Sequence, residues 1–120
     1  IRELAFDPYN AEQLTQSLED ETGVPRIAFG QTICNFAEPT AEFERLVIGG
    51  KMHHNDHPIM SWQIGHTKVK IDVNANKRPV KPEPKDYRKI DGVVAAIMAL
   101  GRASMQEAGS VYDDRGLVTL

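Results

Sequence analysis

The segment KIDGVVAAIMALGRA, residues 89–103, constrains the fold most strongly, because almost every residue after Gly92 is apolar. Helical spacing predicts one apolar stripe, made of Ile90, Val93, Val94, Ile97 and Leu100. It predicts a second stripe that joins Asp91 to Val94, Ala95 and Met98. We therefore expect a long helix over residues 87–106 that is covered on most sides and forms the centre of the core.

Asp91 is the one acidic residue in this segment, and its place in the helix has two interpretations. If the helix begins at Asp86 or Tyr87, the carboxylate of Asp91 lies among apolar neighbours. It then loses hydration at a large cost unless it is paired or bound to a cation. If the helix begins at Asp91 itself, the residue is an N-cap, which is a common use of aspartate. The spacing leaves both interpretations open.

Composition indicates one globular domain or part of one, since the chain has 120 residues, of which 41% are hydrophobic and 26% charged. A single cysteine, Cys34, excludes an internal disulfide and is compatible with a reducing cytosol. No apolar run approaches the ~20 residues that a membrane-spanning helix needs. Because the strand pattern begins at Ile1 without a preceding methionine, we expect part of a longer protein: a single unit, residues 1–120, with a loosely held tail over residues 109–120.

Charge is distributed unevenly along the chain, although the net charge is only −3. Residues 1–50 hold three basic and nine acidic residues, whereas residues 68–89 hold eight basic and three acidic ones. A local basic patch can bind a polyanion even on an acidic domain. The plain alternative is a solvated hairpin with ordinary surface lysines.

The order of predicted elements indicates the α/β class. A strand in IRELAF, a helix over residues 9–23 with Leu14 and Leu18 on its apolar face, and a strand in PRIAFG form one unit with a parallel strand pair. A second helix, EPTAEFERLVIGGK, follows, with Glu38 or Thr40 as its cap. After a loop and a short helix through Trp62, residues 66–82 predict a β-hairpin that turns at residues 74–76, and a proline-rich linker leads to the last helix.

Asp7 and Asp91 are the first candidate site. Asp7 follows a strand, and the carboxyl ends of parallel strands are where α/β proteins place their sites. If the last helix packs across the sheet, the two carboxylates can converge and offer hard oxygen ligands suited to Mg²⁺ or Mn²⁺. Two such ions ~3.5–4 Å apart activate a water and stabilise the leaving oxygen of a phosphodiester. The alternative for Asp7 is a turn residue, because Asp-Pro often ends a strand.

A second candidate is the histidine-rich loop, His53, His54, Asp56 and His57. Histidine and aspartate close together can bind zinc or act as a general base. No cysteine or second histidine pair completes a zinc ligand set here. We therefore favour a polar loop between helices, while contact of one histidine with a phosphate or a water stays open.

Taken together, the chain resembles the C-terminal nuclease domain of the large terminase subunit of tailed double-stranded-DNA bacteriophages. The resemblance rests on LAFDPYNAEQL, FGQT, AEFERLVIGGKMHHNDHPIMSW, KVKIDVNANKRPVKP and, above all, KIDGVVAAIMALGRA. It implies an RNase H-like fold, a mixed sheet flanked by helices, that cuts DNA with two Mg²⁺ or Mn²⁺ ions held by three acidic residues. By position Asp7 corresponds to the second ligand and Asp91 to the third, so that the metal ions would neutralise Asp91.

The same resemblance implies what the rest of the protein contributes. The first acidic ligand, the first three strands and the ATPase motor would lie upstream of Ile1, so we expect this piece alone to be inactive. The DNA backbone would be held, without reading of bases, by the basic hairpin residues Lys68, Lys70, Arg78 and Lys81. His54 and His57 would lie near the groove in which the DNA is held. His66 stands where the family more often has asparagine ahead of the hairpin.

Partners and location follow from the family as well. They would be double-stranded DNA, the ATPase domain of the same chain, the small terminase subunit and the portal ring, in the host cytoplasm at the procapsid portal. Two alternatives remain open. One is a catalytically silent module that docks DNA or the portal, with Asp7 as a turn and Asp91 as a cap. The other is a zinc-histidine nuclease centred on residues 53–57.

Overall fold

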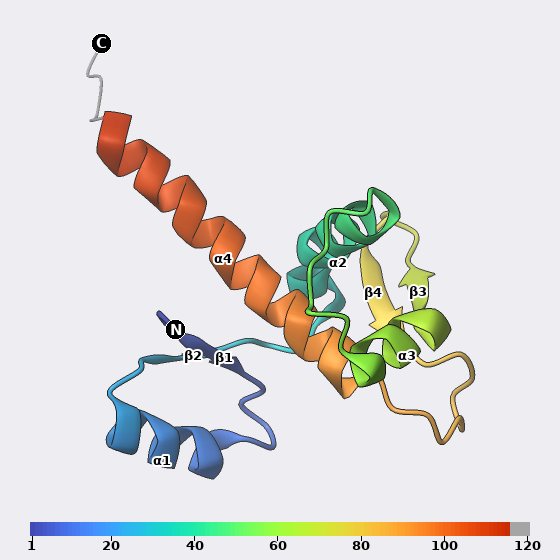
Figure 1. The fold of residues 1–120 in the computed structure, drawn as a ribbon, viewed down its shortest axis with the longest axis horizontal. Coiled ribbons are helices and arrows are strands. Elements are labelled where there is room, and N and C mark those ends of the chain that lie inside the picture. Colours follow the sequence, from blue (N-terminus) through green and yellow to red (C-terminus); the bar gives the residue numbers. More distant parts are fainter. Residues whose placement is uncertain (116–120) are drawn as a thin grey trace.

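The computed structural model describes residues 1–115, which fold into four helices and two pairs of short strands (Figure 1). In chain order the elements are β1 (Leu4–Phe6), α1 (Glu12–Thr22), β2 (Arg26–Ala28), α2 (Ile33–Ile48), α3 (Pro58–His66), β3 (Lys68–Ile71), β4 (Lys77–Val80) and α4 (Asp91–Arg115). The α/β class is thus as predicted. Its strands form two separate two-stranded sheets, β1 with β2 and β3 with β4.

The first sheet has the predicted parallel pairing, with Leu4 opposite Arg26 and Phe6 opposite Ala28. Gly23 ends α1 with φ of +71°, a conformation that glycine adopts without strain. The prediction that Leu14 and Leu18 form a packed apolar face of α1 is wrong, because these side chains are 65% and 38% exposed. The two strands that contact α1, β1 and β2, are only three residues long. They therefore offer too little surface to cover the leucines.

The core lies between α2 and α4. Its buried side chains are Phe36 and Phe43 from α2 and Val93, Ile97 and Met98 from α4. Helix α4 also packs against β1 and α3, so it joins both halves of the fold, as Figure 1 shows. The predicted stripe of Val93 and Ile97 is confirmed. The prediction that most sides are covered is wrong, since Ala95 and Ala99 are exposed.

Helix α2 begins earlier than its cap prediction placed it. The side chain of Thr32 accepts a hydrogen bond from the backbone N–H of Asn35 (3.2 Å), so Thr32 is the N-cap. Pro39 then lies inside α2 and contacts α4 at Gly101. A Cβ at residue 101 would lie 2.8 Å from Cγ of Pro39, so the close approach of the two helices requires glycine.

Helix α4 begins at Asp91 rather than at Asp86 or Tyr87, and it runs to Arg115 rather than ending near residue 106. Residues 109–115 of the predicted tail continue the helix, and residues 116–120 lie outside the described part. At the start of α4 the side chain of Asp91 is exposed. The expectation of a carboxylate among apolar neighbours is therefore wrong, because the helix starts too late to place Asp91 inside the covered stripe.

No helix within residues 1–115 combines the length and the apolar character needed to cross a membrane.

Candidate functional site

Asp7 lies directly after β1 and is half-buried. Its Oδ1 accepts a hydrogen bond from the backbone N–H of Tyr9 (2.9 Å), and its carbonyl oxygen accepts one from Ala11 (3.2 Å). Such a contact from an Asp side chain to the backbone two residues on is an Asx-turn. Asp7 therefore ends the strand as a turn residue, the plainer of its two predicted roles.

Asp91 is the first residue of α4, and its carboxylate has no hydrogen bond or ion pair with any of the side chains or backbone groups that the structure describes. Negative charge is favoured at this end of a helix, because the N-terminal N–H groups carry partial positive charge. By contrast, Asp86 five residues earlier is bound by Arg88, whose guanidinium and backbone N–H hold the pKa of Asp86 below its usual range. Asp91 is thus the acidic residue left open to a ligand at this end of the helix.

The strand before Asp7 and the helix that begins at Asp91 belong to one packed unit. Ala5 of β1 packs against the core cluster that contains Val93 and Ile97. Asp7 therefore follows β1 and Asp91 begins α4, two elements that contact each other directly (Figure 1). Carboxylate oxygens suit Mg²⁺ or Mn²⁺. Among the side chains that the structure describes, however, no three His, Cys, Asp or Glu residues gather as a metal-binding group.

Helix α3 supplies a residue that the sequence analysis missed. The side chain of Gln63 is buried, and its Oε1 accepts hydrogen bonds from the backbone N–H groups of Gly92 (2.8 Å) and Val93 (3.2 Å). Gln63 lies 29 positions before Gly92, and no short motif connects them. The one available signal was the glycine directly after Asp91, which marks a close approach of another group.

The histidine-rich loop forms its own local structure. The Nδ1 atom of His54 accepts a hydrogen bond from the backbone N–H of His57 (3.1 Å), while His53 and His57 are exposed. Asn55 and Asp56 have positive φ angles of 54° and 52°, a conformation that residues other than glycine seldom adopt. Those two residues turn the chain back toward α3. No three metal-binding groups gather in this loop among the described side chains.

The basic residues of the hairpin lie mainly on one face. Lys70 is directly opposite Arg78 and Lys68 is opposite Val80, so Lys68, Lys70 and Arg78 share a face. Lys77 lies on the other face, where its Nζ is 3.2 Å from Oε1 of Glu44 on α2.

Two cations in and beside the hairpin, Lys68 and Lys81, have local partners. Lys81 donates a hydrogen bond to the carbonyl oxygen of Asp86 (3.0 Å), and it lies outside both strands. The Nζ atom of Lys68 is 3.9 Å from Glu83, with both side chains largely in solvent. An exposed pair of this kind contributes little, so Lys68 can exchange Glu83 for another anion.

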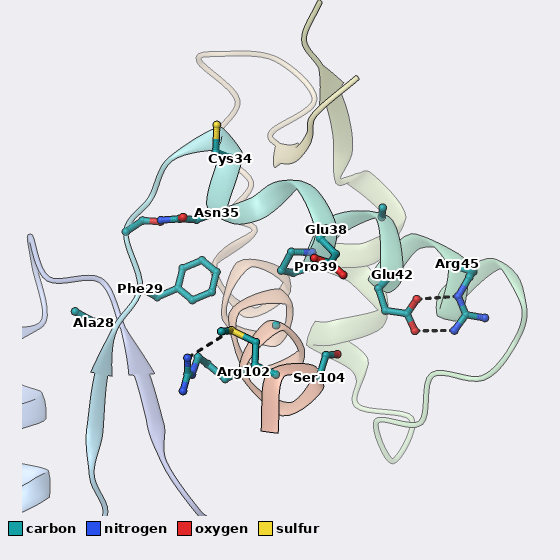
Figure 2. Close-up of a pocket in the computed structure, with 14 residues that line it drawn as sticks. Ala28, Phe29, Cys34, Asn35, Glu38, Pro39, Glu42, Arg45, Arg102 and Ser104 are labelled. Atoms are coloured by element: carbon teal, nitrogen blue, oxygen red, sulfur yellow. Dashed lines mark hydrogen bonds and ion pairs between the residues drawn. The ribbon is translucent and has the colours of Figure 1, made fainter. Parts of the chain in front are cut away.

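A cavity of about 870 Å³ opens elsewhere, between α2 and α4. Figure 2 shows Phe29 and Pro39 on its apolar side and the ion pair between Glu42 and Arg45 at its edge. None of the predicted site residues lines this cavity.

Comparison with known proteins places the chain in a family. The family model of the terminase large subunit, endonuclease domain, matches residues 1–107. The chain belongs to this family. The predicted resemblance is therefore confirmed, and the chain is a terminase endonuclease-domain sequence.

Two curated relatives and one solved structure resemble this terminase sequence. Protein YmfN of Escherichia coli (strain K12) is 36% identical over 115 residues, 95% of this chain and 25% of the relative. The large terminase subunit of Enterobacteria phage HK97 is 28% identical over 118 residues, 95% of this chain and 23% of the relative. The crystal structure of the HK97 large terminase covers 82% of this chain and 20% of its own, with a TM-score of 0.67 and 28% identity. The chain thus spans about a quarter of the length of the curated relatives it matches.

Proposed function

We propose that this terminase endonuclease-domain sequence takes part in metal-dependent cutting of double-stranded DNA, with Asp7 and Asp91 as two of the metal ligands. Family membership supports the nuclease role. The observation that carries the metal assignment is the open carboxylate of Asp91, on a helix that packs against the strand directly before Asp7. The experiment that tests it is replacement of Asp91 in the full-length chain, with loss of DNA cutting as the expected result.

The chemistry of the two donors fits Mg²⁺ or Mn²⁺, since both present carboxylate oxygens and no sulfur or imidazole. When bound, such ions supply an activated water and stabilise the leaving oxygen of a phosphodiester. Asp7 has one oxygen held by the N–H of Tyr9, which orients the carboxylate. A third acidic ligand would come from another part of the full-length chain.

The face of Lys68, Lys70 and Arg78 is our proposed contact for the DNA backbone. Like charges directly opposite each other in a strand pair are destabilising, as Lys70 and Arg78 are here. A phosphate group between them would relieve that repulsion. Contacts of this kind position a duplex without reading its sequence, which suits DNA cutting that tolerates many sequences. His54 and His57 remain proposed neighbours of this face, as does Lys81, whose Nζ also donates a hydrogen bond to the carbonyl oxygen of Asp86.

Neutralising the hairpin cations should make DNA binding less sensitive to salt. For the full-length chain with Lys68→Ala, Lys70→Ala and Arg78→Ala, we expect the slope of log affinity against log salt to flatten by ~0.9 per replaced cation. Fluorescence anisotropy with duplex DNA at several salt concentrations measures that slope. Lys51→Ala, an exposed lysine outside the hairpin, is the matched control and should leave the slope unchanged. Equal slopes for the triple variant and the unmodified chain would remove the hairpin from the DNA contact.

A second candidate is a catalytically silent module that docks DNA or the portal ring. It is favoured by one observation: Asp7 makes an Asx-turn, the structural role that this alternative assigns to it, whereas Asp91 is the first residue of α4 and makes no capping hydrogen bond. Under it, a full-length chain with Asp91→Ala keeps whatever DNA cutting it has. The same variant therefore separates the two functions.

A further inference from the structure

Helix α3 contacts the chain on both sides of Asp91. On the C-terminal side, Oε1 of Gln63 accepts hydrogen bonds from the N–H groups of Gly92 and Val93. On the N-terminal side, Nε2 of His66 lies 3.0 Å from the carbonyl oxygen of Lys89. Gln63 and His66 are three positions apart and both are buried, so they form one side of α3 that faces the start of α4.

These contacts supply hydrogen-bond partners for the first N–H groups of α4, which the residues next to them in sequence do not supply. The first N–H groups of a helix have no partner within the helix and usually bond to the side chain of the residue before it. Here that residue is Ile90, whose carbonyl accepts the first helical bond from Val94 and whose side chain is apolar and buried. Asp91 makes no such bond either. The capping group therefore comes from a different helix.

Gly92 leaves room for the capping group. A Cβ at residue 92 would lie 2.8 Å from Oε1 of Gln63, a distance that real Cβ atoms essentially never show. Any other residue at position 92 would push the Gln63 amide away from the helix end. The Asp-Gly pair in the sequence thus fits the Gln63 contact. Asp91 leaves its carboxylate exposed, and Gly92, which has no Cβ, leaves room for Oε1 of Gln63.

His66 completes the contact from the other side. Since a carbonyl oxygen only accepts hydrogen bonds, the ring donates from Nε2 to Lys89. The ring packs edge-on against Trp62, with centroids 4.5 Å apart. This packing holds the imidazole, and with it the backbone two residues before Asp91.

We infer that Gln63, assisted by His66, is a positioning residue that fixes the direction of the Asp91 carboxylate toward the metal ion. This inference rests on the proposed function of Asp91 as a ligand. Asp91 has no side-chain partner of its own among the described residues, so the backbone on either side of it sets where its carboxylate can reach. Loss of a group that orients a metal ligand typically lowers metal affinity or activity by about 10–100-fold.

Removing the Gln63 acceptor should weaken metal binding. For Gln63→Leu in the full-length chain, we expect the dissociation constant for Mn²⁺, measured by electron paramagnetic resonance of free Mn²⁺, to rise ~10–100-fold. The Mn²⁺ concentration for half-maximal DNA cutting should rise in parallel. Gln63→Glu keeps an acceptor at the same place and should restore values close to those of the unmodified chain. The matched control is Gln16→Leu on the exposed side of α1.

Hydrogen exchange separates positioning from general loss of the fold. In Gln63→Leu the amides of Gly92 and Val93 should exchange faster, while amides in the middle of α2 stay protected. If Gln63→Leu does not fold, Gly92→Ala displaces the same amide group and should raise the Mn²⁺ dissociation constant in the same direction.

The outcomes distinguish this inference from the function it rests on. Unchanged Mn²⁺ affinity in Gln63→Leu and Gly92→Ala, with cutting still lost in Asp91→Ala, would overturn the positioning role and leave the proposed function intact. Cutting that persists in Asp91→Ala would overturn the proposed function itself.

Discussion

Replacing Asp91 with alanine in the full-length terminase chain should lower the rate of DNA cutting by at least ~100-fold, the upper end of the effect of losing an outer partner of a metal ligand. The physical reason is the loss of one of the few carboxylates that would hold a doubly charged ion beside the phosphodiester. The fold should survive, because the side chain is exposed and makes no contact that stabilises the described part of the chain. Cutting of linear duplex DNA in Mg²⁺ or Mn²⁺ is the measurement.

Two controls accompany this variant. Asp20→Asn removes an exposed acidic residue on α1 that contacts only Gln16 among the described residues, and it should cut DNA at the unmodified rate. ATP hydrolysis by the same preparations should be unaffected by Asp91→Ala, since the ATPase would be a separate domain of the full-length chain. Normal cutting by Asp91→Ala would rule out a metal-ligand role for that residue.

Replacing Phe36 with alanine should destabilise the α2–α4 core by ~3–5 kcal/mol, the usual cost of deleting a buried phenylalanine side chain. Phe36 is 3% exposed, contacts the core cluster of α4 and packs edge-on against Phe29, with ring centroids 5.2 Å apart. Replacing Phe36 with alanine therefore loses both the free energy gained by transferring the ring out of water and the packing contacts that the ring makes. Hydrogen exchange of α2 and α4 amides in the full-length chain reports the local free energy of unfolding.

Leu14→Ala is the matched control for Phe36→Ala. Although sequence periodicity predicts Leu14 in the apolar face of α1, the side chain is largely in solvent, so its loss should cost less than ~0.5 kcal/mol. A cost for Leu14→Ala as large as that for Phe36→Ala would mean that α1 is covered in the full-length protein by a part beyond this chain.

The elements that could be predicted from the sequence are those whose signals are local. The stripe of Val93 and Ile97 repeats at helical spacing, so the central helix and its buried side follow directly. The turn of the hairpin is also local, because Asp72 accepts hydrogen bonds from the N–H groups of Asn74 and Asn76 (2.9 Å each).

The features that could not be predicted depend on contacts between distant segments. The first turn of α4 is capped by Gln63 on another helix, whereas the spacing of apolar residues fits a start several residues earlier just as well. The exposure of Leu14 and Leu18 reflects the small sheet beneath α1, which no pattern within α1 reveals. In each case tertiary contacts decide what periodicity leaves open.

The candidate site shows the same division. Residue type and position singled out Asp7 and Asp91, and the structure adds that Asp7 follows β1 while Asp91 begins α4, two elements in direct contact. The free carboxylate of Asp91 and the cap by Gln63 became visible only in three dimensions. Residue type and position in the sequence can thus predict candidate ligands, whereas the groups that orient those ligands come from segments distant in sequence.

The central claim is that one divalent ion is shared by Asp7 and Asp91. Crystals of the full-length terminase soaked in Mn²⁺ and measured at the manganese edge test it most directly. The claim predicts an anomalous peak within bonding distance of carboxylate oxygens from both residues. A manganese peak that contacts neither residue, or carboxylates held on opposite sides of the domain, would contradict it.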